Sequence, residues 1–141
     1  MGYKDAYRDW FSWCDDAEKK ELLLLKDEKE IEDRFYRDLE FGTAGLRGIM
    51  GAGSNRMNRY NVRKATKGFA DYLQDTYGKR CQDGVIIAYD SRNNSADFAA
   101  EAAHVLCAAG IPVKFFTEPE PIPVLSFSVR HFRAAGGIVI T

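Results

Sequence analysis

The chain has 141 residues, 45% of them apolar and 29% charged, and a formal net charge of −1. This composition is typical of one globular domain and gives no indication of disorder. The sequence has neither the roughly 18 consecutive apolar residues of a membrane span nor an apolar signal-peptide core, so we expect a cytoplasmic protein without a membrane partner. Cys14, Cys81 and Cys107 are widely spaced, which predicts free thiols rather than a disulfide framework or a zinc site.

The charges are unevenly distributed along the chain. Residues 1–41 carry 13 acidic and 8 basic side chains, and residues 42–141 carry 8 acidic and 12 basic ones. Between Glu40 and Asp71 there is no acidic residue, and the basic residues in that span are Arg47, Arg56, Arg59, Arg63, Lys64 and Lys67. Nucleic-acid binding needs a larger basic surface, so this surplus suits a small anion better. The alternative is that several of these side chains are ordinary solvated charges.

Residues 1–40 are predicted to be a helical N-terminal extension of two or three short helices. Apolar side chains recur there at helical spacing, and no proline or glycine occurs between Tyr3 and Phe41. We expect Trp10, Trp13 and the leucines at 22–25 to face a core, because apolar stripes at this spacing usually do.

Residues 41–141 show alternating strand and helix patterns. The expected elements, in chain order, are a loop and short strand (41–49), a helix (62–77) with Asn61 as N-cap and Gly78 as its stop, a strand buried on both faces (84–90), a helix capped by Asn94 or Ser95 (to 109), a strand (111–116), a Pro-rich turn (118–123), a short helix (124–132) and a final strand (137–141). This order predicts a three-layer α/β/α domain with a mostly parallel mixed sheet of about four strands.

The first candidate binding motif is glycine-rich and runs from Phe41 to Gly48. Its glycines allow the backbone to approach an anion, while Thr43 adds a hydroxyl and Arg47 a planar guanidinium that matches phosphate oxygens. The spacing excludes a Walker loop and a dinucleotide fingerprint, and a flavodoxin-like nucleotide domain is disfavoured because no phosphate loop opens the helix at 62. The alternative is an ordinary glycine turn that happens to contain one arginine.

Two further motifs fall at predicted strand ends, where open α/β sheets bind ligands. Asp90 and Arg92 follow the buried strand, so they could support an anion, or Asp90 could simply fix its own turn with Arg92 as its ion-pair partner. The strand from Gly136 to Thr141 delivers its carboxyl end to the same edge if the strands are parallel, and we expect Arg47 to lie beside that end. Since the sequence stops there, we expect a fragment of a longer protein.

Together these motifs, with Met50-Gly51 and Asn55 to Asn58, resemble the first domain (domain I) of the α-D-phosphohexomutase family, the phosphoglucomutases and phosphomannomutases, in the branch with the FGTAGLRG opening motif. The resemblance covers roughly residues 41–141. It implies reversible intramolecular phosphoryl transfer on a sugar phosphate through a phosphoserine and a bisphosphorylated sugar. Thr43 and Arg47 match positions that contact the phosphate, and Asp90 and Arg92 are assigned supporting roles.

The resemblance also implies what this chain lacks. The nucleophilic serine is expected two residues after Thr141, so the chain is truncated just before the phosphoserine loop, contains no catalytic residue and is expected to be inactive alone. Mg²⁺ would be held mainly by a second domain, with no ligand in this chain. A glucose 1,6-bisphosphate-type primer is expected, and the partners are sugar monophosphate, sugar bisphosphate and the remaining domains, without nucleic acid.

Two questions stay open on the sequence. Glucose, mannose and pentose phosphates all remain possible substrates. The alternative function is a stand-alone α/β module that binds a sugar phosphate or docks a partner without catalysis.

Overall fold

The computed structural model describes residues 2–141. Two compact units make up the chain, one ending at Asn61 and the other running from Val62 to Thr141. None of the helices in the described part is long and apolar enough to cross a membrane.

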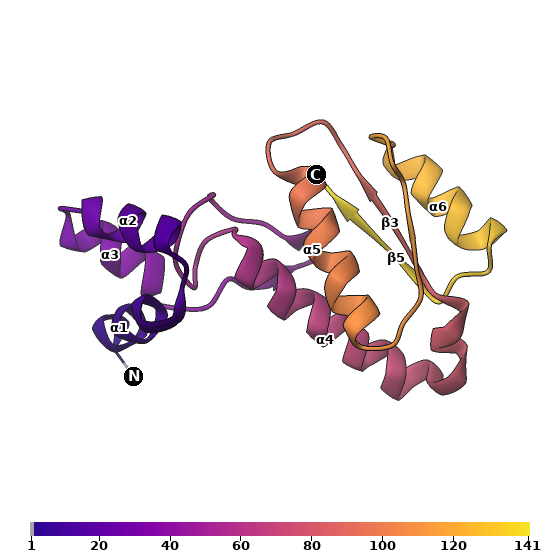
Figure 1. Cartoon of the computed structure of the whole chain (residues 1–141), viewed down its shortest axis with the longest axis horizontal. Helices are drawn as coiled ribbons and strands as arrows, with labels where there is room; N and C mark the ends of the chain where they lie inside the picture. The colour runs from indigo at the N-terminus through magenta and orange to yellow at the C-terminus, as the bar shows by residue number, and fades with distance from the viewer. Residues whose placement is uncertain (1) are drawn as a thin grey trace. The chain divides into compact units, whose positions relative to one another are not determined.

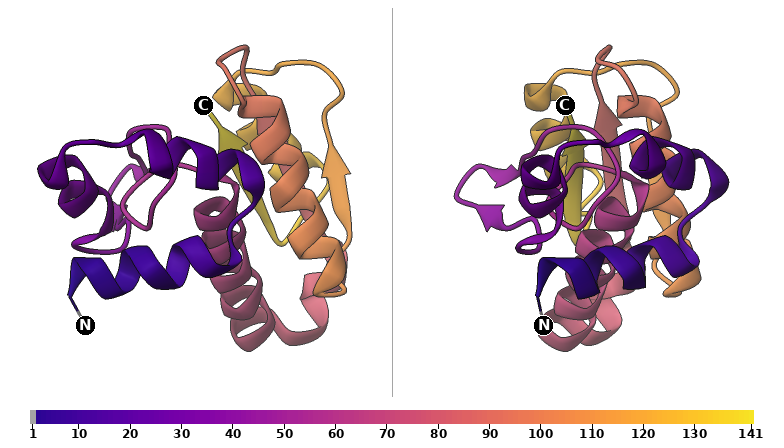
Figure 2. Two further views of the ribbon diagram at one scale, coloured as in Figure 1. Left: turned by 60° about the vertical axis from the view of Figure 1, so that its left-hand side comes forward. Right: turned by 90° about the vertical axis from the view of Figure 1, so that its left-hand side faces the viewer.

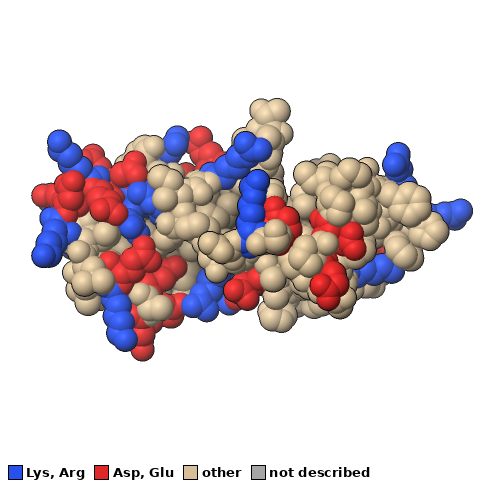
Figure 3. Space-filling view, turned by 90° about the horizontal axis from the view of Figure 1, so that it is seen from above, with Lys and Arg blue, Asp and Glu red and all other residues tan. Residues whose placement is uncertain are grey.

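Three short helices form the start of the first unit, as predicted: α1 (Tyr3–Trp13), α2 (Asp16–Leu24) and α3 (Glu28–Phe35). Asp15 caps α2 by accepting a hydrogen bond of 2.9 Å from the Glu18 amide, and Asp27 caps α3 by accepting one of 2.9 Å from the Lys29 amide. Lysine, arginine and acidic side chains are interspersed on the face of this unit drawn at the left of Figure 3.

The core of the first unit contains fewer of the N-terminal apolar side chains than the sequence suggested. Its buried members are Trp10, Cys14, Leu22, Phe35 and Ala52. Trp10 and Leu22 are therefore buried as expected, but Trp13, Leu23 and Leu24 are 47%, 68% and 77% exposed. The prediction that all of them face a core was wrong, because short helices such as α1 and α2 bury only one stripe of their surface.

The glycine-rich segment forms two short strands, β1 (Phe41–Gly42) and β2 (Gly45–Leu46), which pair with each other. Helix α4 (Arg59–Tyr77) follows a loop at 51–58 and starts three residues earlier than predicted. It ends at Tyr77, as predicted, and a 3₁₀ turn begins at Gly78 (η1, Gly78–Asp83). Asn61 is not the N-cap of this helix. Asn58 is, because its Oδ1 accepts the Asn61 amide at 3.0 Å, while the Asn61 side chain donates to loop carbonyls.

The second unit has a parallel sheet with strand order β4-β3-β5, formed by β3 (Val85–Tyr89), β4 (Val113–Phe115) and β5 (Gly136–Ile140). Helices α5 (Ser95–Ala108) and α6 (Ile122–His131) make the connections. The predicted α/β/α class is confirmed. The sheet has three strands rather than about four, and it is not mixed, because the segment after Phe41 forms its own two-stranded sheet instead of joining it.

Helices cover both faces of this sheet, with α5 and α6 on opposite sides (Figure 1 and Figure 2). Ile86 and Ala88 pack with Leu125 of α6, whereas a Cβ on Gly136 would lie 2.9 Å from the ring of Phe69 in α4. All five residues of β3 are consequently buried, as its apolar run predicts. The register pairs Tyr89 with Ile140, so β3 and β5 end together at the same edge.

Candidate functional site

The glycine-rich motif forms an exposed β-hairpin whose tip carries Thr43. Phe41 pairs with Leu46 and Gly42 with Gly45, which leaves Thr43 and Ala44 as the two-residue connection. Gly45 has φ = 99°, a conformation that favours glycine and lets the chain turn back within so few residues. Arg47 follows β2 directly and is exposed.

Arg47 differs from the other arginines in the span that lacks acidic residues. Arg56 is buried and pairs with Asp33 at 2.6 Å, Arg59 pairs with Asp15, and Arg63 pairs with Glu101 at 2.6 Å. Among residues 2–141, the Arg47 guanidinium makes no hydrogen bond or ion pair. The other three arginines of this span therefore each have an acidic partner, and Arg47 is the one whose charge is left for an external anion.

Asp90 and Thr141 lie together at the carboxyl edge of the parallel sheet. The Asp90 amide donates to the Ile140 carbonyl at 3.0 Å, and the Thr141 hydroxyl donates to Asp90 Oδ2 at 2.5 Å. The other carboxylate oxygen of Asp90 accepts the Arg92 amide at 3.0 Å and the Ser95 hydroxyl at 2.9 Å. Asp90 thus fixes its own turn and also connects the ends of two strands that are 51 residues apart in sequence.

These contacts explain the acidity of Asp90. The hydrogen bond from Thr141, followed by those from Arg92 and Ser95 and the nearby Arg92 charge, holds the pKa of the Asp90 carboxyl below its usual value. The Arg92 Nε lies 3.4 Å from Asp90 Oδ2 while the Arg92 side chain stays 73% exposed. Ser95 was not predicted as a partner of Asp90. Its position five residues later, at the start of α5, could have indicated that its hydroxyl lies near the Asp90 turn.

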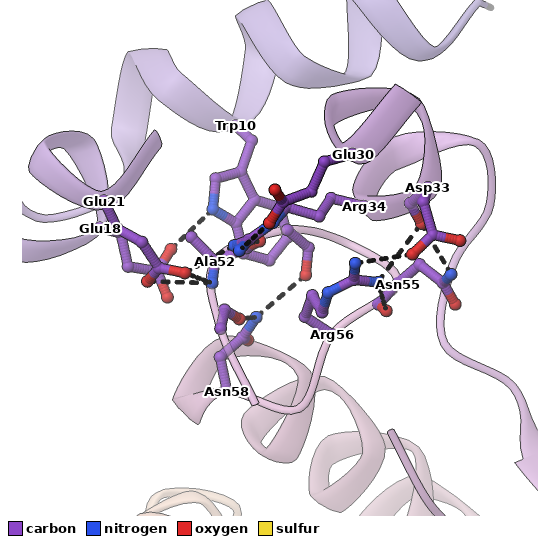
Figure 4. A network of polar contacts seen from close by, with 12 residues as sticks. Trp10, Glu18, Glu21, Glu30, Asp33, Arg34, Ala52, Asn55, Arg56 and Asn58 are labelled. Atoms are coloured by element: carbon purple, nitrogen blue, oxygen red, sulfur yellow. Dashed lines mark hydrogen bonds and ion pairs between the residues drawn. The ribbon is translucent and has the colours of Figure 1, made fainter. Parts of the chain in front are cut away.

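A buried polar network in the first unit was not predicted from the sequence (Figure 4). Arg34 Nη1 donates to Glu21 Oε1 at 2.5 Å and to the Ala52 carbonyl at 3.1 Å, and its Nη2 donates to Glu30 at 2.8 Å. Asn58 donates to the carbonyls of Gly51 and Gly53 at 2.9 Å each. The Glu30–Arg34 pair has the i,i+4 spacing of a helical ion pair, which the sequence does show. No sequence pattern marks the bonds of Arg34 and Asn58 to the carbonyls of Ala52, Gly51 and Gly53, because these acceptors are backbone atoms of a loop.

A surface hollow of about 340 Å³ lies on the N-terminal helices and includes Tyr3, Lys4, Arg8 and Lys26. Glu28 occupies part of its rim and pairs with Lys4 at 2.5 Å. It contains no residue of the three motifs, so we do not place the site there.

The predicted site residues fall into two groups. Thr43 and Arg47 belong to the first unit, whereas Asp90, Arg92 and Thr141 are brought together in the second. That Arg47 lies beside the end of β5 stays a prediction. Within residues 2–141 no three histidine, cysteine or acidic side chains are grouped as a metal site would require.

Known proteins resemble the chain over most of its length. The family model for phosphoglucomutase/phosphomannomutase, alpha/beta/alpha domain I, matches residues 38–141. A phosphopentomutase of Homo sapiens is 37% identical over 86% of this chain, a phosphoglucomutase of Staphylococcus haemolyticus 35% over 94%, and a glucose 1,6-bisphosphate synthase of Mus musculus 34% over 96%. No solved structure is significantly similar.

The chain spans only 21% to 24% of the length of these relatives. The matched region contains the hairpin, the Asp90 turn and the whole parallel sheet, so the similarity extends over every motif described above. The chain therefore belongs to the phosphoglucomutase/phosphomannomutase family, of which it carries the α/β/α domain I.

Proposed function

We propose that the chain is the first domain of an enzyme that moves a phosphoryl group reversibly within a sugar phosphate, through a phosphoserine and a bisphosphorylated sugar. In this proposal residues 1–40 are a helical extension and residues 41–141 form the domain itself. The names of the relatives support a sugar-phosphate substrate and a glucose 1,6-bisphosphate-type primer. The three free cysteines support a cytoplasmic location.

The observation that carries the proposal is the unpaired guanidinium of Arg47 beside a glycine hairpin. In phosphoryl transfer the protein mainly positions the group and stabilises its charge, so a planar guanidinium that can donate two parallel hydrogen bonds to phosphate oxygens is an expected component. The exposed hydroxyl of Thr43, four residues earlier, adds a donor on the same hairpin. Because Arg47 has no acidic partner within residues 2–141, its charge is not neutralised before a phosphate arrives.

Asp90 and Arg92 have a supporting role in this proposal. The carboxylate of Asp90 holds the hydroxyl of Thr141, and Arg92 fixes the orientation of that carboxylate through its amide and its guanidinium. If the phosphorylated serine follows two residues after Thr141, this contact sets the starting position of its loop. A displaced loop would misalign the phosphoryl group with the sugar hydroxyl, and such misalignments are costly for rate.

Magnesium, when bound, would act as a Lewis acid on the transferring group. The described residues offer no cluster of ligands that fits it, so we assign its binding to other domains and derive no step through it. We also propose that the polypeptide of residues 1–141 is inactive alone, because the serine and the sugar-binding domains would have to be supplied by the longer protein.

The test compares the longer protein with the 141-residue chain in assays of 1-phosphate to 6-phosphate or 5-phosphate conversion, using glucose, mannose and pentose phosphates with magnesium and a bisphosphate primer. We expect turnover only by the longer protein. Replacing Arg47 by lysine keeps the charge but removes the two-pronged geometry, and kcat should fall roughly 10²-fold or more. The matched control is Arg80→Lys, at an exposed arginine in η1. An unchanged kcat for Arg47→Lys would refute the role of Arg47.

A further inference from the structure

The hairpin that carries Arg47 is fastened at both ends to one loop. Before β1, the Leu39 amide donates to the Ser54 carbonyl at 2.8 Å. After β2, the Ile49 carbonyl accepts the Met57 amide at 2.7 Å. An isolated two-stranded hairpin is marginal in water, and this one has only two residue pairs. Its position therefore depends on the loop at 51–58.

That loop is held in turn by side chains of α2 and α3 (Figure 4). Glu21 accepts the Ala52 amide through Oε1 at 3.2 Å and Oε2 at 3.3 Å, and Arg34 donates to the Ala52 carbonyl at 3.1 Å. One peptide segment is thus bound on both its donor and its acceptor side. Since Glu21 and Arg34 also bind each other at 2.5 Å, the three groups form a closed set.

Close packing makes this arrangement specific. Gly53 has φ = 129°, and a Cβ there would lie 2.8 Å from the Arg34 carbonyl oxygen. The same carbonyl accepts the Asn55 amide at 2.9 Å. The loop therefore lies directly against the backbone of α3, where only glycine fits.

Arg56 provides a second attachment of the loop to α3. Its side chain is 6% exposed, and it donates to the Asp33 carboxylate at 2.6 Å and to the Asp33 carbonyl at 3.4 Å. Charged groups are rarely buried unless they are paired, so this contact fixes the loop as well as neutralising the arginine.

We infer that the N-terminal helices act as a clamp that positions the phosphate-binding hairpin, with Glu21 and Arg34 as positioning residues for Arg47. The role of Arg47 in this inference rests on the proposed function. The clamp itself concerns only how rigidly the hairpin is held, which can be measured without any ligand. Releasing Ala52 from Glu21 frees the loop, and the hairpin ends at Leu39 and Ile49 then lose their fixed attachment. Arg47 would still be present and charged but would no longer be held in one place.

Glu30 offers a matched control. It binds the same Arg34 guanidinium at 2.8 Å, four residues away within α3, but within residues 2–141 its side chain makes no hydrogen bond or ion pair with the loop at 51–58. Glu21→Ala and Glu30→Ala each leave Arg34 with one carboxylate partner. Only Glu21→Ala removes the bonds to Ala52.

The experiment measures backbone ¹⁵N heteronuclear NOEs of the 141-residue chain at the hairpin glycines Gly42 and Gly45 and at Gly48, which follows the hairpin. We expect Glu21→Ala to lower these NOEs clearly below those of β3, and Glu30→Ala to leave them unchanged. Equal hairpin NOEs in the two variants and the unmodified chain would overturn the clamp. If Glu21→Ala does not fold, Glu21→Gln is used instead. Glutamine keeps an oxygen acceptor but loses the charge, so we expect the hairpin NOEs to fall by an intermediate amount. Hairpin NOEs equal to those of the unmodified chain would contradict the clamp.

A second readout separates the clamp from the proposed function. Binding of glucose 1,6-bisphosphate is measured by calorimetry for the longer protein and for its Arg47→Ala variant, and we expect weaker binding by the variant. Equal affinities would reject the phosphate-binding role of Arg47, while the NOEs still decide the clamp. In the longer protein, Glu21→Ala should lower kcat about 10-fold or more with a smaller effect on KM, because a misplaced group mainly costs the transition state. Equal kcat for Glu21→Ala and Glu30→Ala would contradict positioning.

Discussion

Replacing Asn58 by alanine should destabilise the first unit by an amount that its contacts allow us to calculate. The Asn58 side chain is buried, caps α4 through the Asn61 amide at 3.0 Å, and donates to the Gly51 and Gly53 carbonyls at 2.9 Å each. Loss of an N-cap costs about 1 kcal/mol, and loss of each side-chain hydrogen bond costs about 1 kcal/mol. The expected decrease in the free energy of unfolding is therefore about 3 kcal/mol.

Asn58→Asp separates the two contributions. Aspartate keeps an oxygen to cap the helix but has no amide to donate to the loop carbonyls, so a loss of about 2 kcal/mol is expected. Asn55→Ala is the matched control, because Asn55 makes one exposed side-chain bond of 2.8 Å to the Asp33 carbonyl. Its loss should cost less than about 1 kcal/mol.

Urea unfolding followed by tryptophan fluorescence measures these differences. Both tryptophans, Trp10 and Trp13, lie in the first unit, so the fluorescence signal follows the unfolding of that unit. With an m-value of about 1–3 kcal/mol/M, Asn58→Ala should lower the urea midpoint by about 1–3 M. The reasoning is refuted if Asn58→Ala and Asn55→Ala lie within about 0.5 kcal/mol of each other, because surface substitutions alone produce changes of that size.

Two further predictions concern the second unit. The pKa of the Asp90 carboxyl is lowered in the folded chain, so the ionised carboxylate stabilises the fold fully above the usual pKa of 3.8. This stabilisation is lost as the pH falls from 3.8 through the lower pKa of the folded chain, so the Tm difference between Asp90→Asn and the unmodified chain should narrow between about pH 5 and pH 2. A Tm difference that stays constant over this range would disprove that the Asp90 carboxylate stabilises the fold. Gly137→Ala places a Cβ 2.7 Å from Val129 Cγ2 of α6 and should cost about 1–3 kcal/mol by overpacking. The control Gly68→Ala lies in open space within α4 and should instead stabilise by about 0.5–1 kcal/mol, and a Gly137→Ala chain as stable as this control would contradict the packing.

Local sequence patterns predicted the regular elements well. The apolar run from Gly84 to Asp90 gave a strand buried on both faces, and the alternation of strands and helices gave the α/β/α class. Glycine at position 78 correctly marked the end of α4. These predictions succeeded because periodicity and backbone preference depend on neighbouring residues, which the sequence shows directly.

Predictions failed where two neighbouring residues could fill the same role or where the partner was distant. Asn58 and Asn61 are both good cap residues, and only the start of α4 at Arg59 distinguishes them. The short segment after Phe41 can form a strand, but its pairing with Leu46 rather than with the main sheet depends on the turn at Thr43 and Ala44. A strand's partner is set by the tertiary fold, not by its own composition.

By itself, the sequence determined which segments fold into helices and strands and which residues, Arg47 and Asp90 above all, belong to phosphohexomutase-like motifs. The tertiary structure decided which charges are already neutralised. Arg56 and Arg47 look alike in sequence, yet Arg56 is buried against Asp33 while Arg47 has no partner among residues 2–141. The physical reason is that an ion pair forms only between groups within a few ångströms of each other, and folding alone brings residues so distant in sequence to that separation.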